Sequence, residues 1–147
     1  MIRSILIGLS AGQRAMTPLA VVTGAARRGQ LPDAPRWLSH PLVATGAVTL
    51  AAAEMAGDKM KTAPDRIVPA GLIGRGLTGA FAGAMLARPD QRKVGAALGA
   101  VTAIASSYLG WTARMAALRR YGQTPTGVVE DAAVLAGGWA AATAVRS

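Results

Sequence analysis

The chain has 147 residues and a formal net charge of +9, with 52% hydrophobic but only 16% charged residues. Soluble proteins average about 25% charged residues, so this composition favours a chain whose surface faces lipid. The absence of cysteine excludes disulfides, thiol catalysis and cysteine-ligated metal. His40 is the only histidine, which excludes a histidine-rich metal site, and we expect neither a metal nor a cofactor.

Five apolar segments follow one another along the chain, separated by short connections that contain Gly and Pro. Each is close to the roughly 20 residues that a membrane-spanning helix needs. We predict an all-α integral membrane bundle of about five transmembrane helices, forming one domain over residues 1–147. A soluble helical bundle is the alternative, because only the run 94–113 is free of charge over about 18 residues. The segments are 4–26, 41–60, 67–87, 94–118 and 128–145.

The first segment carries an arginine and a proline well inside it. At 1.5 Å per residue, Arg14 lies about 15 Å from the start of the helix. Pro18 removes a helical hydrogen bond and frees the carbonyl of Arg14, which makes this carbonyl a plausible ligand. We predict one helix here. A re-entrant first segment, or a topology of four helices, would redistribute the charges.

The later segments carry further charges, and with five spans all of them fall in the membrane half on the side of the N-terminus. Arg75 lies about 12 Å deep in the third helix, measured from that side. A charge in hydrocarbon costs at least about 2.5 kcal/mol, so these side chains should pair and face the interior or a wet cavity. We predict a polar vestibule formed by Arg14, Thr17, Glu54, Asp58, Arg75, Arg114, Glu130 and Asp131.

Three interpretations of this vestibule stay open. Buried ion pairs often serve only to fix helix register. A site for an ion or solute in a channel or transporter is the second interpretation. In the third, Glu54 and Asp58, which share a helix face, act as acid and base on a lipid-soluble substrate. No arrangement of Ser, His or Cys supports a nucleophile, so we assign no catalytic residue and favour a protein that is not an enzyme.

Pairs of glycines four residues apart recur along the chain. In lipid, such pairs mark close contacts between helices, because the absence of a side chain lets backbones approach. The pattern supports tight packing and allows association into homo-oligomers. The pairs are Gly8 with Gly12, Gly79 with Gly83, and Gly95 with Gly99.

Most basic residues lie at the ends of apolar segments rather than in a stripe interleaved with aromatic residues. This pattern indicates contacts with lipid headgroups, assigned here to Lys59, Lys61 and Arg66, and argues against binding of nucleic acid. With five spans, Lys and Arg divide six to seven between the two sides, so the positive-inside rule leaves the orientation open.

Three short motifs resemble a known family. Residues 12–18, Gly-Gln-Arg-Ala-Met-Thr-Pro, are similar to the Gly-x-Arg-x-x-Thr-Pro signature of the bacterial family called domain of unknown function 4126. Glu54 with Asp58 and Lys59 resembles its Glu-x-x-x-Asp-Lys segment, and Glu130-Asp131 its C-terminal acidic pair. The resemblance implies a multi-spanning protein of the bacterial cytoplasmic membrane and implies no activity.

The sequence therefore leads to one main functional hypothesis and two alternatives. The main hypothesis is a small channel- or transporter-like protein with a charged vestibule in one half of the membrane. The first alternative is an accessory or structural subunit of a larger membrane complex. The second is a membrane enzyme that acts on a lipid-soluble substrate. Beyond the lipid bilayer, the expected partners are a second copy of the chain or a larger complex.

Overall fold

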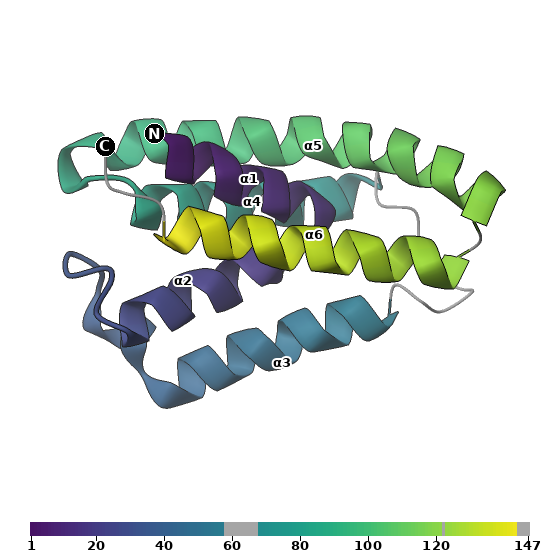
Figure 1. Cartoon of the computed structure of the whole chain (residues 1–147). Coiled ribbons are helices and arrows are strands. Elements are labelled where there is room, and N and C mark those ends of the chain that lie inside the picture. Colours follow the sequence, from purple (N-terminus) through teal and green to yellow (C-terminus); the bar gives the residue numbers. More distant parts are fainter. Residues whose placement is uncertain (58–67, 122, 144–147) are drawn as a thin grey trace.

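The computed structural model describes residues 1–57, 68–121 and 123–143, and for residues 118, 120, 121 and 123–127 only the backbone. These residues form six α-helices and two 3-10 helices without any strand, which confirms the all-α prediction. Figure 1 shows the helices packed lengthwise into one bundle. In chain order they are α1 (Ile2–Gln13), α2 (Thr17–Arg27), η1 (Arg36–Ser39), α3 (Pro41–Gly57), α4 (Pro69–Leu86), η2 (Pro89–Gln91), α5 (Arg92–Tyr121) and α6 (Gln123–Thr143).

The prediction of one helix over residues 4–26 was wrong, because the helix is interrupted between Gln13 and Thr17. Arg14 has extended backbone angles, with φ −141 and ψ 111. Pro18 lies in the first turn of α2, where a missing N–H costs little. In a continuous helix its ring would collide with the carbonyl of Arg14, so a new helix starts instead of a kinked one.

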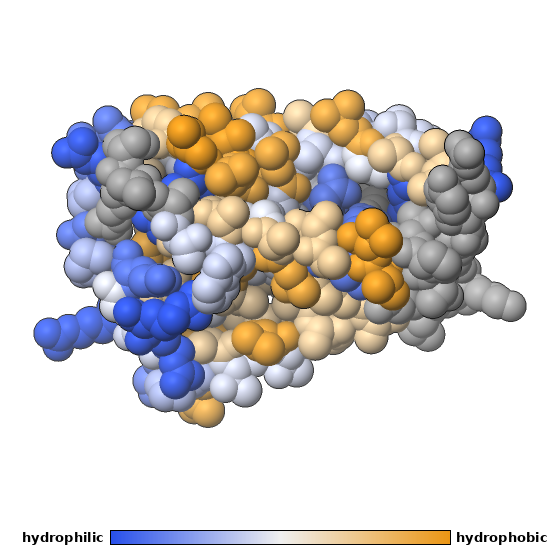
Figure 2. Space-filling view, viewed as in Figure 1, coloured by the Kyte–Doolittle hydropathy of each residue, from blue (hydrophilic) through white to orange (hydrophobic). Residues whose placement is uncertain are grey.

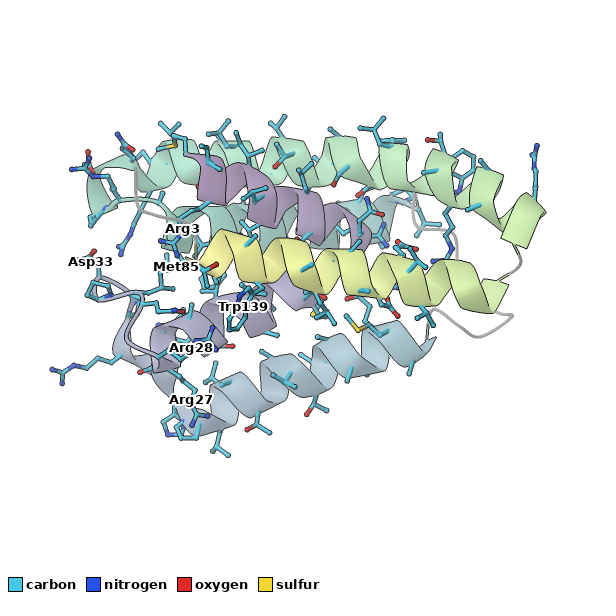
Figure 3. All side chains as sticks on the ribbon, viewed as in Figure 1. Arg3, Arg27, Arg28, Asp33, Met85 and Trp139 are labelled. Atoms are coloured by element: carbon cyan, nitrogen blue, oxygen red, sulfur yellow. The ribbon has the colours of Figure 1, made fainter. Side chains whose placement is uncertain are left out.

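Helices α1 and α2 form a hairpin that begins and ends at the same end of the bundle. Arg3, at the start of α1, donates from Nε to the carbonyl of Ala141 at 2.8 Å. Arg28, just after α2, lies 5.2 Å from the ring centroid of Trp139. We call this end of the bundle, which holds Met1 and the end of α6, the near end (Figures 1 and 3). The opposite end is the far end.

The remaining four helices alternate in direction between the two ends (Figure 1). At 1.5 Å per residue, α3, α4 and α6 are about 25, 27 and 31 Å long and α5 about 45 Å, whereas α1 and α2 reach only about 18 and 16 Å. Within the described residues, the stretch Pro89–Ala117 alone is both long and apolar enough to cross a membrane by itself. Helix α3 is apolar but shorter. The five-span prediction is therefore not confirmed.

The expected ends of the last two helices differ from those observed. Residues 121–125 were expected to connect them, because Pro125 usually breaks a helix. Instead α5 continues to Tyr121 and α6 begins at Gln123. Pro125 lies in the first turn of α6, where proline is tolerated.

The tightest packing joins α1, α4 and α5, and it is made by the three predicted glycine pairs. A Cβ placed on Gly79 would lie 2.6 Å from the carbonyl oxygen of Gly99, and one on Gly8 would lie 2.6 Å from the same oxygen. Gly83 and Gly95 make the next contact toward the near end. All three pairs are therefore used inside one chain, so they need no second copy to explain them.

On α3 the apolar residues are sorted by size, with small residues buried and large ones exposed. On α3 the buried residues are Ala44, Ala47 and Ala51. Leu42 and Leu50, on the same helix, are 76% and 53% exposed. On the face that Figure 2 shows, apolar residues cover the middle of the bundle and hydrophilic residues gather at the near end. Soluble proteins rarely expose so much contiguous apolar surface.

Candidate functional site

The break between α1 and α2 is held by a carboxylate from α3. Glu54 accepts the backbone N–H of Ala15 at 2.7 Å through Oε1 and that of Met16 at 2.8 Å through Oε2. These amides lie where α2 begins, and a helix start leaves backbone N–H groups without partners inside the helix. A carboxylate is favoured here because the start of a helix carries a partial positive charge. Glu54 therefore closes the tip of the hairpin.

A buried ion pair fixes the same tip to α6. Arg14 donates from Nε at 2.9 Å and from Nη2 at 2.6 Å to Oδ1 of Asp131. Arg14 is 1% exposed and Asp131 is 8% exposed, so water screens this pair very little. Together with Glu54, the pair ties one turn of backbone to both α3 and α6.

Hydrogen bonds between α1 and α5 hold the last turn of α1. The hydroxyl of Ser107 donates to the carbonyl of Gly12 at 3.0 Å, and the amide of Gln13 donates to the carbonyl of Ser106 at 2.6 Å. The Gly12 bond occupies one of the carbonyls that the end of a helix leaves without a helical partner. The end of α1 is thereby satisfied from a neighbouring helix, as a buried helix end requires.

Two other predicted vestibule residues lie near the tip but differ in their surroundings. Thr17, the first residue of α2, is buried, and its Oγ1 has no hydrogen-bond partner within the described part of the chain. Arg75 is buried on α4, four residues before Gly79. Gly79 and Gly8 both pack against Gly99, so they lie at the same level of the bundle. Because α4 is antiparallel to α1, Arg75 lies level with the end of α1, where a cation is favoured.

The second observed ion pair lines an open groove. Nη1 of Arg114 lies 3.3 Å from Oε2 of Glu130, and these side chains are 11% and 16% exposed. The groove runs between α5 and α6 over α1, has a volume of about 870 Å³, and is walled mainly by apolar residues. Figure 2 shows hydrophilic atoms recessed between apolar ones toward the far end. We call this cavity the α5–α6 groove.

The predicted vestibule residues thus divide into a closed set and an open set. Arg14, Glu54 and Asp131 meet at the hairpin tip. Asp131 pairs with the side chain of Arg14, and Glu54 accepts backbone hydrogen bonds from the two residues that follow Arg14. Arg114 and Glu130 face the groove. These charges lie toward the far end rather than on the side of the N-terminus, because the hairpin returns and reverses the direction of every later helix. Asp58, Lys59, Lys61 and Arg66 lie outside the described residues.

The match to a family model covers nearly the whole chain. The model named Domain of unknown function (DUF4126) matches residues 2–145. The chain belongs to this family. Among curated proteins and among solved structures, nothing matches it.

The motifs that carry the DUF4126 resemblance are far apart in sequence but meet in space. Residues 12–18 form the tip of the hairpin, Glu54 binds its backbone, and Asp131 binds its arginine. In this chain the three motifs therefore contribute to one structural unit, the turn between α1 and α2 and the two carboxylates, Glu54 and Asp131, that hold it.

Sequence reasoning missed the groups that hold the near end. Arg3 was counted only as a charge near the membrane surface. It donates from Nε to Ala141 and from Nη2 to the carbonyl of Ala142 at 2.7 Å, and so it caps the end of α6. Figure 3 shows Arg3, Arg28 and Trp139 gathered at this end. Only the spatial return of α6 to α1 reveals the contact, since more than 130 residues separate the partners.

Proposed function

We propose that this protein is a small transporter- or channel-like protein of the bacterial cytoplasmic membrane. In this proposal α3, α4, α5 and α6 cross the bilayer, and α1 and α2 form a re-entrant hairpin. The observation that carries the proposal is the reversal of the chain at Arg14–Met16, inside the bundle and beside charged side chains. Interrupted helices with charged surroundings at membrane depth are the usual sites of ion and solute binding in transporters.

Three features support a bilayer location. On α3 large apolar side chains point outward while small ones pack inside, as membrane helices do. The lengths of the four long helices, about 25 to 45 Å, suit a hydrocarbon core of about 30 Å. The backbone break is buried against protein, which is the condition under which lipid tolerates irregular backbone.

The same topology gives an argument for the orientation, which the sequence alone leaves open. In the described residues the near end carries seven basic side chains, at Arg3, Arg27, Arg28, Arg36, Arg88, Arg92 and Lys93. Over the same described residues the far end carries Arg119 and Arg120 on α5. Seven basic residues against two favour a cytoplasmic near end.

In the observed arrangement the hairpin tip is closed. Passage of a solute through this half of the bundle requires the Arg14–Asp131 pair or the Glu54 contacts to separate. Flux into proteoliposomes tests this directly, with protons, K⁺ and Cl⁻ as probes, each monitored by its own indicator. We expect flux of one probe in the wild type and a changed rate in Asp131→Asn. Ser39→Cys, an exposed substitution away from the tip, serves as the matched control.

A structural subunit of a larger membrane complex is the second candidate, and the closure of the tip favours it. Both oxygens of Glu54 and one oxygen of Asp131 already bind groups of the hairpin. Groups engaged in this way stabilise a fold without any transported solute. Absence of flux for all three probes in correctly inserted protein, together with a fixed partner that co-purifies, would favour the subunit over the transporter. Glu54 is equally unsuited to acid–base catalysis while both of its oxygens accept backbone hydrogen bonds.

A further inference from the structure

We propose that the α5–α6 groove binds one acyl chain of a phospholipid whose headgroup carries both a phosphate and an ammonium group. This inference rests on the bilayer location given under the proposed function. It does not depend on whether the protein transports any of the three probes. The argument uses the length of the groove, the position of its polar residues, and the charges at its far end.

The groove matches the thickness of one lipid leaflet. Its lining runs along α5 from Ser106 to Ala117 and along α6 from Val129 to Gly137. At 1.5 Å per residue these stretches measure about 16 and 12 Å, and half of a 30 Å hydrocarbon core is about 15 Å. The volume of about 870 Å³ lies within the range of cavities that hold small molecules.

The polarity of the groove changes along its length. Gln13, Arg114 and Glu130 supply polar groups toward the far end. Ser10 and Ser106 also line it, but their hydroxyls donate to the backbone carbonyls of Leu6 and Leu9. The rest of the groove therefore presents an apolar wall, which is the surface that an acyl chain needs.

The polar end lies at the depth of lipid headgroups. Helix α5 is about 45 Å long, close to the full thickness of a bilayer with its headgroup regions. Arg114 lies seven residues before Tyr121, the last residue of α5, or about 10 Å from that end. The ion pair with Glu130 is thus at the boundary between headgroups and hydrocarbon.

The charges at this end complement a zwitterionic headgroup. Arg114 suits a phosphate and Glu130 an ammonium group, and both side chains are still partly exposed. A second copy of the chain would instead cover the pair with an apolar helix and leave its charges without solvent, which is costly.

Lipid titration followed by native mass spectrometry tests the inference on delipidated protein. The probes are phosphatidylethanolamine, which carries the ammonium group, and phosphatidylglycerol, which lacks it. The groove is blocked by Ala133→Trp, since Ala133 lines it and is exposed. Ala132→Trp is the matched control, because Ala132 is also exposed on α6 but does not line the groove. The variant Arg114→Gln/Glu130→Gln removes both charges together, and circular dichroism checks that each variant is folded.

We expect one tightly bound phosphatidylethanolamine per chain and weaker binding of phosphatidylglycerol. Ala133→Trp should weaken binding about tenfold, the equivalent of two methylene groups left exposed, while Ala132→Trp stays within about twofold. The double charge variant should bind the two lipids alike. Equal lipid binding by Ala133→Trp and Ala132→Trp would overturn the site. The proposal would also be overturned if Ala133→Trp removed a dimer from the mass spectrum and left lipid binding unchanged.

Extraction of membranes at high pH separates this inference from the proposed function. If the protein remains in the membrane but binds no lipid in the groove, only the lipid-binding inference is contradicted. If the protein is released, the bilayer location is contradicted, and the proposed function with it.

Discussion

Arg14 and Asp131 are 117 residues apart in the chain, and Nη2 of the arginine lies 2.6 Å from Oδ1 of the aspartate. The pair joins the turn between α1 and α2 to α6. Because Arg14 is almost fully buried, the pair cannot exchange its contacts for water. Its role in holding the hairpin can be measured apart from any transport.

Removal of one charge of this pair should destabilise the fold strongly. In Asp131→Asn the guanidinium of Arg14 stays buried and loses its contact with a carboxylate charge, which costs about 3–5 kcal/mol. The apolar double variant Arg14→Met/Asp131→Leu should lose less, since it leaves no buried charge at either position. Unfolding in mixed detergent micelles measures both free energies.

The exposed pair Arg88–Asp90 gives a control for that measurement. Its N–O distance is 3.9 Å and its side chains are 60% and 68% exposed. Arg88→Gln should change the free energy of unfolding by less than about 1 kcal/mol. If Asp131→Asn behaves like Arg88→Gln, the buried pair does not hold the hairpin.

Replacement of Glu54 should loosen the hairpin tip in particular. Glu54→Gln keeps one acceptor oxygen for the amides of Ala15 and Met16, and it loses the charge that strengthens both bonds. Hydrogen exchange of a peptide spanning residues 10–20 should therefore become faster, with a loss of about 1.5–3 kcal/mol for each weakened bond at most. Glu130→Gln, which faces the groove, should leave exchange in this peptide unchanged. Equal protection in Glu54→Gln and the wild type would show that the carboxylate is not needed at the tip.

The glycine contacts predict a sharp difference between two positions on α4. In Gly79→Ala the new Cβ meets the carbonyl of Gly99 at 2.6 Å, so the helices must separate, at a cost of about 1–3 kcal/mol. In Gly74→Ala the new Cβ has nothing within 4 Å, and the higher helix propensity of alanine should stabilise α4 by up to about 1 kcal/mol. Thermal unfolding followed by circular dichroism distinguishes the two. A Gly79→Ala variant as stable as Gly74→Ala would show that α4 and α5 are not in close contact.

Cysteine labelling decides between a hairpin and a spanning first segment. The chain has no native cysteine, so single substitutions can be made directly. Ile2→Cys and Gln30→Cys are both at exposed positions. Ile2 is the first residue of α1, and Gln30 follows α2. In a hairpin an impermeant thiol reagent reaches both from the same side of sealed vesicles. A spanning segment would place them on opposite sides.

The sequence predicts several features because they depend on local chemistry. Glycines four residues apart indicated close helix contacts, and all three pairs make them. The proline in the first segment indicated a disturbed helix. Whether Pro18 bends a helix or begins a new one depends on partners for the freed amides of Ala15 and Met16. That partner is Glu54, on another helix, and a single sequence does not show which helix faces the break.

The identity of ionic partners was beyond the sequence for a similar reason. Opposite signs indicated that Arg14 would pair, but Glu54, Asp58, Glu130 and Asp131 were equal candidates. Glu54 was expected to pair with a cation or to act with Asp58 as acid and base, and instead it binds two backbone amides. The hairpin decides these contacts, because the return of the chain to the near end reverses the direction in which every later helix runs through the bundle.

The hairpin has a consequence for the order of assembly in a membrane. The ribosome makes residues 15 and 16 before Glu54, which follows 39 residues after Ala15, and long before Asp131. In the proposed bilayer location lipid offers no hydrogen bonds to replace either partner, so the tip would not reach its final depth until α3 and α6 have entered the bilayer. Under that proposal the first segment to be translated would be among the last to reach its final position, and assembly of the fold would run against the order of synthesis.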